Sequence, residues 1–213
     1  FSLQLTNEGG VEGTIRILKN IMGLWILQEC KRHWAGQGQN LEYSEIMQMA
    51  QDAKPFEAFI NPDDGRFFSP GNMPDKINSY LKDTGQNEIT DKGQMARVIL
   101  ESLAFAYRRV MGYLEGISTT GIDTLHVVGG GSKNVLLNQL MANSLNKKII
   151  TGPAEATAIG NIMMQAIGMG DMASVADGRQ KIAESFELRE YQPKETAVWN
   201  KKYNKIKRYF ENE

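Results

Sequence analysis

A short hydrophobic run that ends in three consecutive glycines is the feature that most constrains the fold of this chain. Residues 125–128 have the pattern of a buried strand, and residues 129–131 are all glycine. A helical pattern follows at residues 133–145, and a second strand-like run follows at residues 148–151. A strand, a glycine turn, a helix and another strand in this order predict a parallel α/β layer.

Most of the remaining chain has the spacing of helices, so we expect helix to outweigh strand. Besides residues 133–145, the expected helices are residues 14–33, 41–54, 73–84, 90–116, 153–167, 175–186 and 195–210. The expected strands are residues 1–6, 125–128 and 148–151, with a turn at residues 7–10. The prediction is a helix-rich α/β fold over residues 1–213, in which residues 194–213 form a terminal helix that docks by its apolar face.

The composition excludes several classes of protein. The chain has 213 residues, of which 41% are hydrophobic and 23% are charged, which is typical of a globular protein and not of a disordered or membrane-spanning one. Its 24 basic and 25 acidic side chains create no overall field that would attract nucleic acid or a membrane. Cys30, the one cysteine, cannot form an intrachain disulfide, which fits the cytoplasm. The chain begins at Phe1, and we expect it to be a piece of a longer protein.

The glycine turn is a candidate ligand site, because glycine lacks a Cβ that would keep a ligand away from the backbone. Open α/β sheets bind ligands at the carboxyl ends of their strands, and the following helix offers unpaired N–H groups. The Rossmann spacing is not met, because Asn134 stands where the third glycine would be, and the chain has no P-loop motif. The three glycines alone leave open a ligand site or a simple tight turn.

Two amides in the expected helix at residues 14–33 are further candidates. Asn20 and Gln28 are eight positions apart, which places them on one face of a helix. They could hydrogen-bond within the fold or hold a polar ligand in a cleft, and the pattern alone favours the first. Glu155 is expected in the first turn of its helix, and Gly160 in the middle of that helix indicates close approach of a neighbour.

Taken together, these segments resemble the carboxyl-terminal half of the rhamnulokinases, sugar kinases of the FGGY type. The resemblance is carried by residues 6–10 with 18–25, residues 126–134 with 136–140, and residues 152–161. It implies a partial actin-like, ribonuclease-H-like domain that lacks its opening strands. It also implies a parent enzyme that uses ATP and Mg²⁺ to phosphorylate L-rhamnulose at its 1-position.

The resemblance also implies roles for single residues. Asn20 would contact the ketose and Gln28 the nucleotide. Asn138 would support the cleft, and the rest of the nucleotide site would be Gly129, Gly130, Gly131, Ser132 and Asn134. The family's catalytic aspartate and phosphate loops lie in the amino-terminal half of the protein, so no catalytic residue is assigned here and this chain alone should not turn over. The alternative is an actin-like scaffold or regulatory domain without catalysis.

Overall fold

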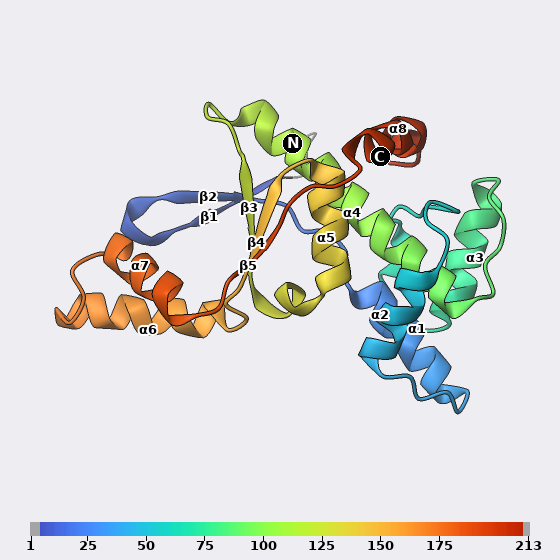
Figure 1. Cartoon of the computed structure of the whole chain (residues 1–213), viewed down its shortest axis with the longest axis horizontal. Coiled ribbons are helices and arrows are strands. Elements are labelled where there is room, and N and C mark those ends of the chain that lie inside the picture. Colours follow the sequence, from blue (N-terminus) through green and yellow to red (C-terminus); the bar gives the residue numbers. More distant parts are fainter. Residues whose placement is uncertain (1–4, 211–213) are drawn as a thin grey trace. The chain divides into compact units, whose positions relative to one another are not determined.

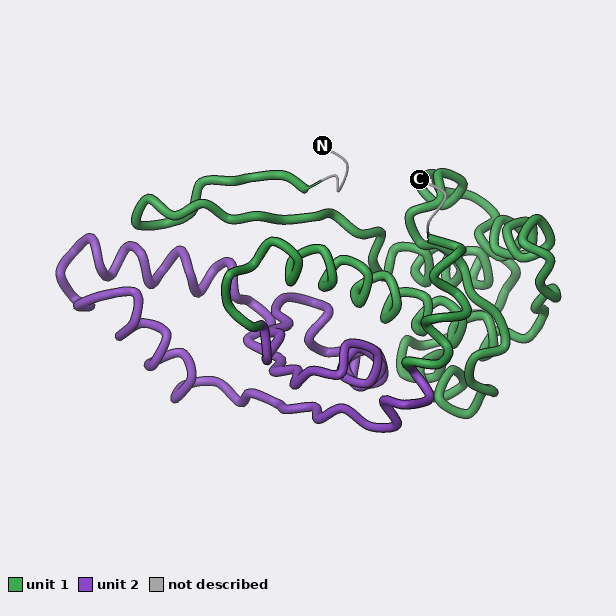
Figure 2. The backbone as a smooth tube through the Cα atoms, turned by 90° about the horizontal axis from the view of Figure 1, so that it is seen from above, with its two compact units in different colours: residues 1–121, 200–213 green, residues 122–199 purple. Residues whose placement is uncertain are grey.

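The computed structural model describes residues 5–210, which form two compact units (Figure 2). Among the described residues, unit 1 comprises residues 5–121 and 200–210, and unit 2 comprises residues 122–199.

Unit 1 is mainly helical (Figure 1). Its elements are the strands β1 (Thr6–Gly9) and β2 (Ile15–Leu18), the helices α1 (Trp25–Gly36), α2 (Tyr43–Asp52), α3 (Met73–Asp83) and α4 (Lys92–Ile117), and the 3-10 turns η1 (Val11–Gly13), η2 (Gly65–Phe67) and η4 (Lys207–Tyr209). The terminal helix α8 (Thr196–Ile206) begins in unit 2 and ends in unit 1.

Unit 2 is an α/β layer. Its elements are β3 (Thr124–Val127), η3 (Gly129–Lys133), α5 (Val135–Leu145), β4 (Lys148–Thr151), α6 (Ala156–Met169), α7 (Val175–Ser185) and β5 (Arg189–Tyr191). β3 pairs with β4 in parallel, with Leu125 opposite Ile149, and β5 pairs antiparallel with β4. α5 packs on this sheet and α6 packs on α7. The predicted order of strand, glycine turn, helix and parallel strand is therefore confirmed.

The first twenty residues differ from the prediction. Residues 1–4 lie outside the described residues, and residues 7–9, expected as a turn, belong to β1. β1 pairs antiparallel with β2, and β2 occupies residues that were expected as the start of a helix. The turn lies instead at η1, where Glu12 has a φ of +56° and Gly13 a φ of +72°. The described residues therefore contain five strands rather than the three expected.

The helices are largely as predicted, apart from α1. The expected helix at residues 14–33 was wrong in its first half, because α1 begins only at Trp25. α4 begins at Lys92 rather than at residue 90, and the Asp91 side chain caps it by accepting a hydrogen bond from the Gln94 N–H at 2.7 Å. α5 begins at Val135 rather than residue 133, because the preceding residues form the separate turn η3.

The core of unit 1 lies where α4 packs against α2 and α1. A Cβ on Gly93 of α4 would lie only 2.7 Å from the Met49 carbonyl oxygen of α2, so a glycine is needed for the two backbones to approach. Further along α4, the ring of Phe105 stacks on Tyr203 of α8 at a centroid distance of 5.8 Å. None of the described helices has the length and hydropathy needed to cross a membrane.

Candidate functional site

The glycine turn continues the pairing of β3 and β4 beyond their last strand residues. The Gly152 N–H donates to the Val127 carbonyl at 2.9 Å, and the Gly129 N–H donates to the Pro153 carbonyl at 3.4 Å. Gly129 has a φ of +73°, a conformation that glycine adopts far more readily than other residues. These contacts fix the turn at the carboxyl ends of two parallel strands.

The backbone of the turn is not covered by side chains. A Cβ built on Gly129 or Gly130 would meet no atom within 4 Å, and one on Gly131 would meet only Val127 Cγ1, at 3.8 Å. Gly130 is exposed. The positions that a Cβ would occupy on these glycines are therefore largely free, although the Gly129 N–H and the carbonyls of Gly129 and Gly131 are hydrogen-bonded within the chain.

Three polar side chains hold the turn from within the fold. Ser132 Oγ donates to the Gly129 carbonyl at 2.7 Å, and Asn138 Nδ2 donates to the carbonyls of Gly131 and Ser132 at 3.3 and 3.0 Å. The Asn134 Oδ1 caps α5 by accepting from the Leu137 N–H at 2.9 Å. Asn138 is fully buried, and its Oδ1 has no hydrogen-bond partner among the described residues. These side chains fix the direction of the peptide groups in the turn.

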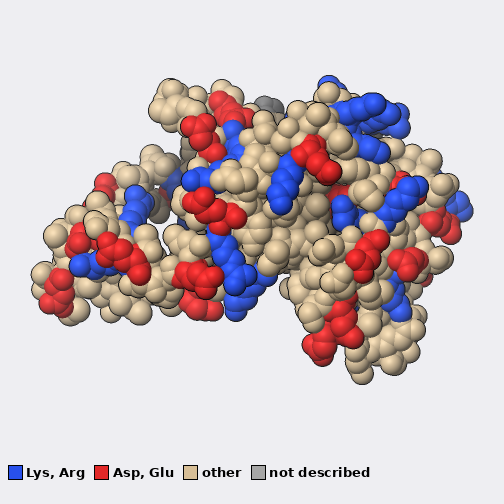
Figure 3. Space-filling view, in the orientation of Figure 1, with Lys and Arg blue, Asp and Glu red and all other residues tan. Residues whose placement is uncertain are grey.

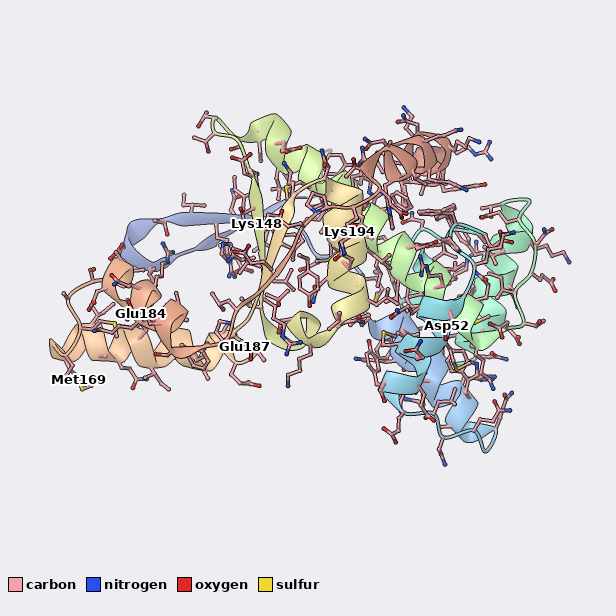
Figure 4. All side chains as sticks on the ribbon, viewed as in Figure 1. Asp52, Lys148, Met169, Glu184, Glu187 and Lys194 are labelled. Atoms are coloured by element: carbon pink, nitrogen blue, oxygen red, sulfur yellow. The ribbon has the colours of Figure 1, made fainter. Side chains whose placement is uncertain are left out.

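A pocket of about 430 Å³ lies next to the turn, within unit 2. It is lined by Ser132, Lys133, Thr151, Gly152, Pro153, Ala154, Glu155, Phe186, Glu187 and Arg189. The pocket is lined by both basic and acidic side chains. Arg189 Nε lies 3.4 Å from a carboxylate oxygen of Glu187. Glu187 is labelled in Figure 4 and precedes β5. Basic and acidic side chains are also interspersed over the face shown in Figure 3. The pocket can therefore accept a polar ligand without favouring a strongly charged one.

Asn20 and Gln28 both lie in unit 1, but they do not share a helix. Asn20 lies in the loop between β2 and α1, whereas Gln28 lies in the first turns of α1. Both side chains are exposed, which corrects the expectation of two amides buried on one helix face. Gln28 is the exposed position beside Ile26 and Leu27, which are fully buried. Both amides are therefore accessible to solvent-borne ligands.

Sequence reasoning missed the residue that anchors the Asn20 loop. Asp63 accepts a hydrogen bond from the Met22 N–H at 2.9 Å and pairs with Arg109 at 3.0 Å. The charge of Asp63 also affects Tyr107: burial raises the pKa of the Tyr107 hydroxyl, and the Asp63 carboxylate raises that pKa further. Asp63 stands in a segment rich in turn-forming residues, and an isolated acid there gives no sequence signal of a long-range contact.

Glu155 and Gly160 were also selected from the sequence, and neither has the surroundings that were expected. Glu155 is the exposed residue before α6 rather than part of its first turn. A Cβ on Gly160 would meet nothing within 4 Å, so the expected close neighbour is absent from the described residues. In the α6–α7 pair, the close approach occurs at Gly178 of α7, where an added Cβ would lie 2.3 Å from Met163 Sδ.

The described residues contain no group of three or more histidine, cysteine, aspartate or glutamate side chains that could hold a metal ion.

Comparison with known proteins identifies relatives over nearly the whole chain. Residues 1–169 match the family model of the FGGY family of carbohydrate kinases, C-terminal domain. A rhamnulokinase of Bacteroides thetaiotaomicron is 46% identical over 202 residues, which cover 95% of this chain and 41% of the relative. A rhamnulokinase of Ligilactobacillus salivarius is 42% identical over 97% of this chain and 41% of its own length. The chain thus spans about two fifths of the length of these curated relatives.

Solved structures give the same result for the fold. A xylulose kinase of Lactobacillus acidophilus superposes with a TM-score of 0.69 at 17% identity, over 99% of this chain and 41% of the other. A Plasmodium falciparum glycerol kinase with ADP superposes with a TM-score of 0.61 at 16% identity, over 96% of this chain and 42% of the other. At these identities the likeness concerns the fold alone, and it confirms the predicted helix-rich, actin-like α/β class.

Proposed function

This chain belongs to the FGGY family of carbohydrate kinases, whose C-terminal domain it matches, and on that premise we propose that it is the nucleotide- and sugar-binding part of an ATP-dependent rhamnulokinase. The reaction would transfer the γ-phosphoryl group of ATP to the 1-hydroxyl of L-rhamnulose. The sugar is inferred from the relatives named rhamnulokinase, which are 46% and 42% identical to this chain.

The single observation that carries the nucleotide part of the proposal is the bare backbone of the glycine turn. A Cβ on Gly130 would meet no protein atom within 4 Å, and this residue lies just past the carboxyl end of β3. A purine nucleoside offers a flat face, which suits a stretch of backbone without Cβ atoms. We place the adenosine on Gly129, Gly130 and Gly131, with Ser132 and Asn134 shaping the turn.

The exposed amides of unit 1 supply the other proposed contacts. An amide side chain both donates and accepts hydrogen bonds, so Asn20 can bind ketose hydroxyls and Gln28 can bind the nucleotide. These residues would bind and orient the substrates, which is a large part of catalysis in phosphoryl transfer. We assign no general base and no Mg²⁺ ligand to this chain, and we expect the chain alone to bind ATP weakly and not to turn over.

The test is a substrate panel with the gene product that contains this domain. Purified protein is incubated with ATP and L-rhamnulose, D-xylulose or glycerol, and the formation of ADP is followed while the product is analysed by mass spectrometry and NMR. We expect kcat/KM for L-rhamnulose to exceed that for the other two by at least about 10-fold, because hydrogen-bonding sites discriminate between hydroxyl patterns.

Preference for another ketose would overturn the assignment of the sugar. Absence of turnover with every sugar, in protein that is folded, would favour the alternative of an actin-like scaffold or regulatory domain.

A further inference from the structure

The loop between β2 and α1 is tethered to a segment more than forty residues away. The Met22 N–H donates to Asp63 Oδ1 at 2.9 Å, and Trp25 Nε1 donates to the Phe67 carbonyl at 3.1 Å. Asn20 lies two residues before the first tether, and Gln28 lies three residues after the second. Asp63 and Phe67 therefore hold the chain between the two proposed ligand contacts.

A buried arginine fixes the carboxylate that makes the first tether. Arg109 of α4 is only 7% exposed, and its Nη2 donates to Asp63 Oδ2 at 3.0 Å. Its Nη1 donates to the Phe210 carbonyl at 3.0 Å, and the guanidinium lies 5.0 Å from the centroid of the Phe210 ring. Each oxygen of Asp63 thus has a separate partner, and the side chain has little freedom to turn away from Met22.

From these contacts we propose that Asp63 is a positioning residue for the ketose site. It acts through the Met22 amide to hold Asn20 in the orientation that binds the sugar, with Arg109 as its anchor. This inference rests on the proposed function, because the role of Asn20 as a ketose contact belongs to that proposal. Displacement of a substrate-binding group by about 1 Å can lower the rate by about 100-fold, so such a tether matters for activity.

The neighbouring acid provides a matched control. Asp64 differs from Asp63 by one position, and its Oδ1 accepts from the Arg66 N–H at 3.0 Å and pairs with Arg66 Nε at 2.7 Å. The side-chain contacts of Asp64 thus reach Arg66 of η2, whereas the Asp63 side chain contacts the Met22 amide of the Asn20 loop and Arg109 of α4. Loss of Asp64 removes an ion pair of similar length but does not release Met22.

The experiment compares D63A, D63N and D64N in the gene product that contains this domain. Initial rates are measured against L-rhamnulose and against ATP, and thermal unfolding is recorded for each variant. We expect D63A to lower kcat/KM for the ketose by about 10-fold or more, with KM for ATP changed by less than about 3-fold. D63N should lie between D63A and the parent, because the amide oxygen can still accept from Met22 but cannot pair with Arg109 as a charge. D64N should leave KM for the ketose within about 2-fold even where it lowers Tm.

A second readout is independent of turnover. Amide hydrogen exchange of residues 19–24 should accelerate in D63A but not in D64N, while exchange of α2 stays unchanged. Unchanged exchange at Met22 in D63A, or an unchanged kcat/KM for the ketose in folded D63A, would overturn the positioning role. If the parent protein turns over no ketose, the proposed function fails and this role fails with it. An active parent whose D63A and D64N variants behave alike refutes the positioning role only.

Discussion

Gly129 and Gly130 are adjacent glycines with different structural reasons to lack a side chain. Gly129 has a φ of +73°, so most substitutions there would strain the backbone itself. Gly130 has no such φ, and a Cβ added to it would meet no atom of the protein within 4 Å. In the fold alone, Gly130 is therefore replaceable by alanine, and its proposed purpose concerns the ligand.

Replacing Gly130 with alanine should leave stability unchanged but weaken ATP binding. The added methyl group would occupy space that we assign to the nucleoside, and such overpacking costs about 1–3 kcal/mol. We expect KM for ATP to rise by about 10-fold in the gene product, with KM for the ketose unaffected. The control is Gly112→Ala in α4, which should change neither constant. An unchanged KM for ATP in Gly130→Ala would remove this residue from the nucleotide site.

Cys30 of α1 should be unreactive in the folded protein. The residue is fully buried, and burial raises the pKa of its thiol far above the ordinary value, with the Glu29 carboxylate raising it further. Because the thiolate is the reactive form, iodoacetamide at pH 8 should not alkylate Cys30 until the protein is unfolded by denaturant. Mass spectrometry of native and denatured samples measures this. Equal labelling of the two samples would show that α1 opens readily.

At the scale of elements, the contact of α2 with α4 depends on one glycine. A Cβ on Gly93 would lie 2.7 Å from the Met49 carbonyl oxygen and 2.9 Å from its carbonyl carbon, and these backbone atoms can shift only if the helices separate. Gly112 lies in the same helix with no atom within 4 Å of an added Cβ.

Gly93→Ala should therefore lower the free energy of unfolding by about 1–3 kcal/mol. Gly112→Ala should raise it by about 0.5–1 kcal/mol, because alanine favours the helix and no packing is disturbed. Urea unfolding followed by circular dichroism measures both variants. Changes in the free energy of unfolding that have the same sign and a similar size in the two variants would show that helix propensity, and not the approach of α2, determines stability at both positions.

The elements also show what the sequence could predict and what it could not. The path from β3 through the glycine turn and α5 to β4 was predictable, because a short apolar strand and a glycine triplet give local signals. The β1–β2 hairpin was missed because Ile15 and Leu18 fit the spacing of a helix together with Met22 and Trp25. In the structure Ile15 and Ile17 are exposed on a strand, so the helical spacing there was coincidental.

At the scale of the whole molecule, the proposed ligand contacts come from both compact units. Asn20 and Gln28 belong to unit 1, and the glycine turn belongs to unit 2. Their assignment to one reaction came from resemblance to a family, since the separation in sequence gave no physical reason to join them. The Asp63–Arg109 pair that anchors the Asn20 loop was also not predictable, because it joins residues 46 positions apart.

We propose that the glycine turn receives the nucleoside of ATP. The most direct test is titration of the ¹⁵N-labelled chain with ATP while backbone amide shifts are followed. We expect saturable shifts at the amides of Gly129, Gly130, Gly131 and Ser132, and we expect Gly130→Ala to weaken them. Saturable shifts confined to residues remote from this turn would contradict it.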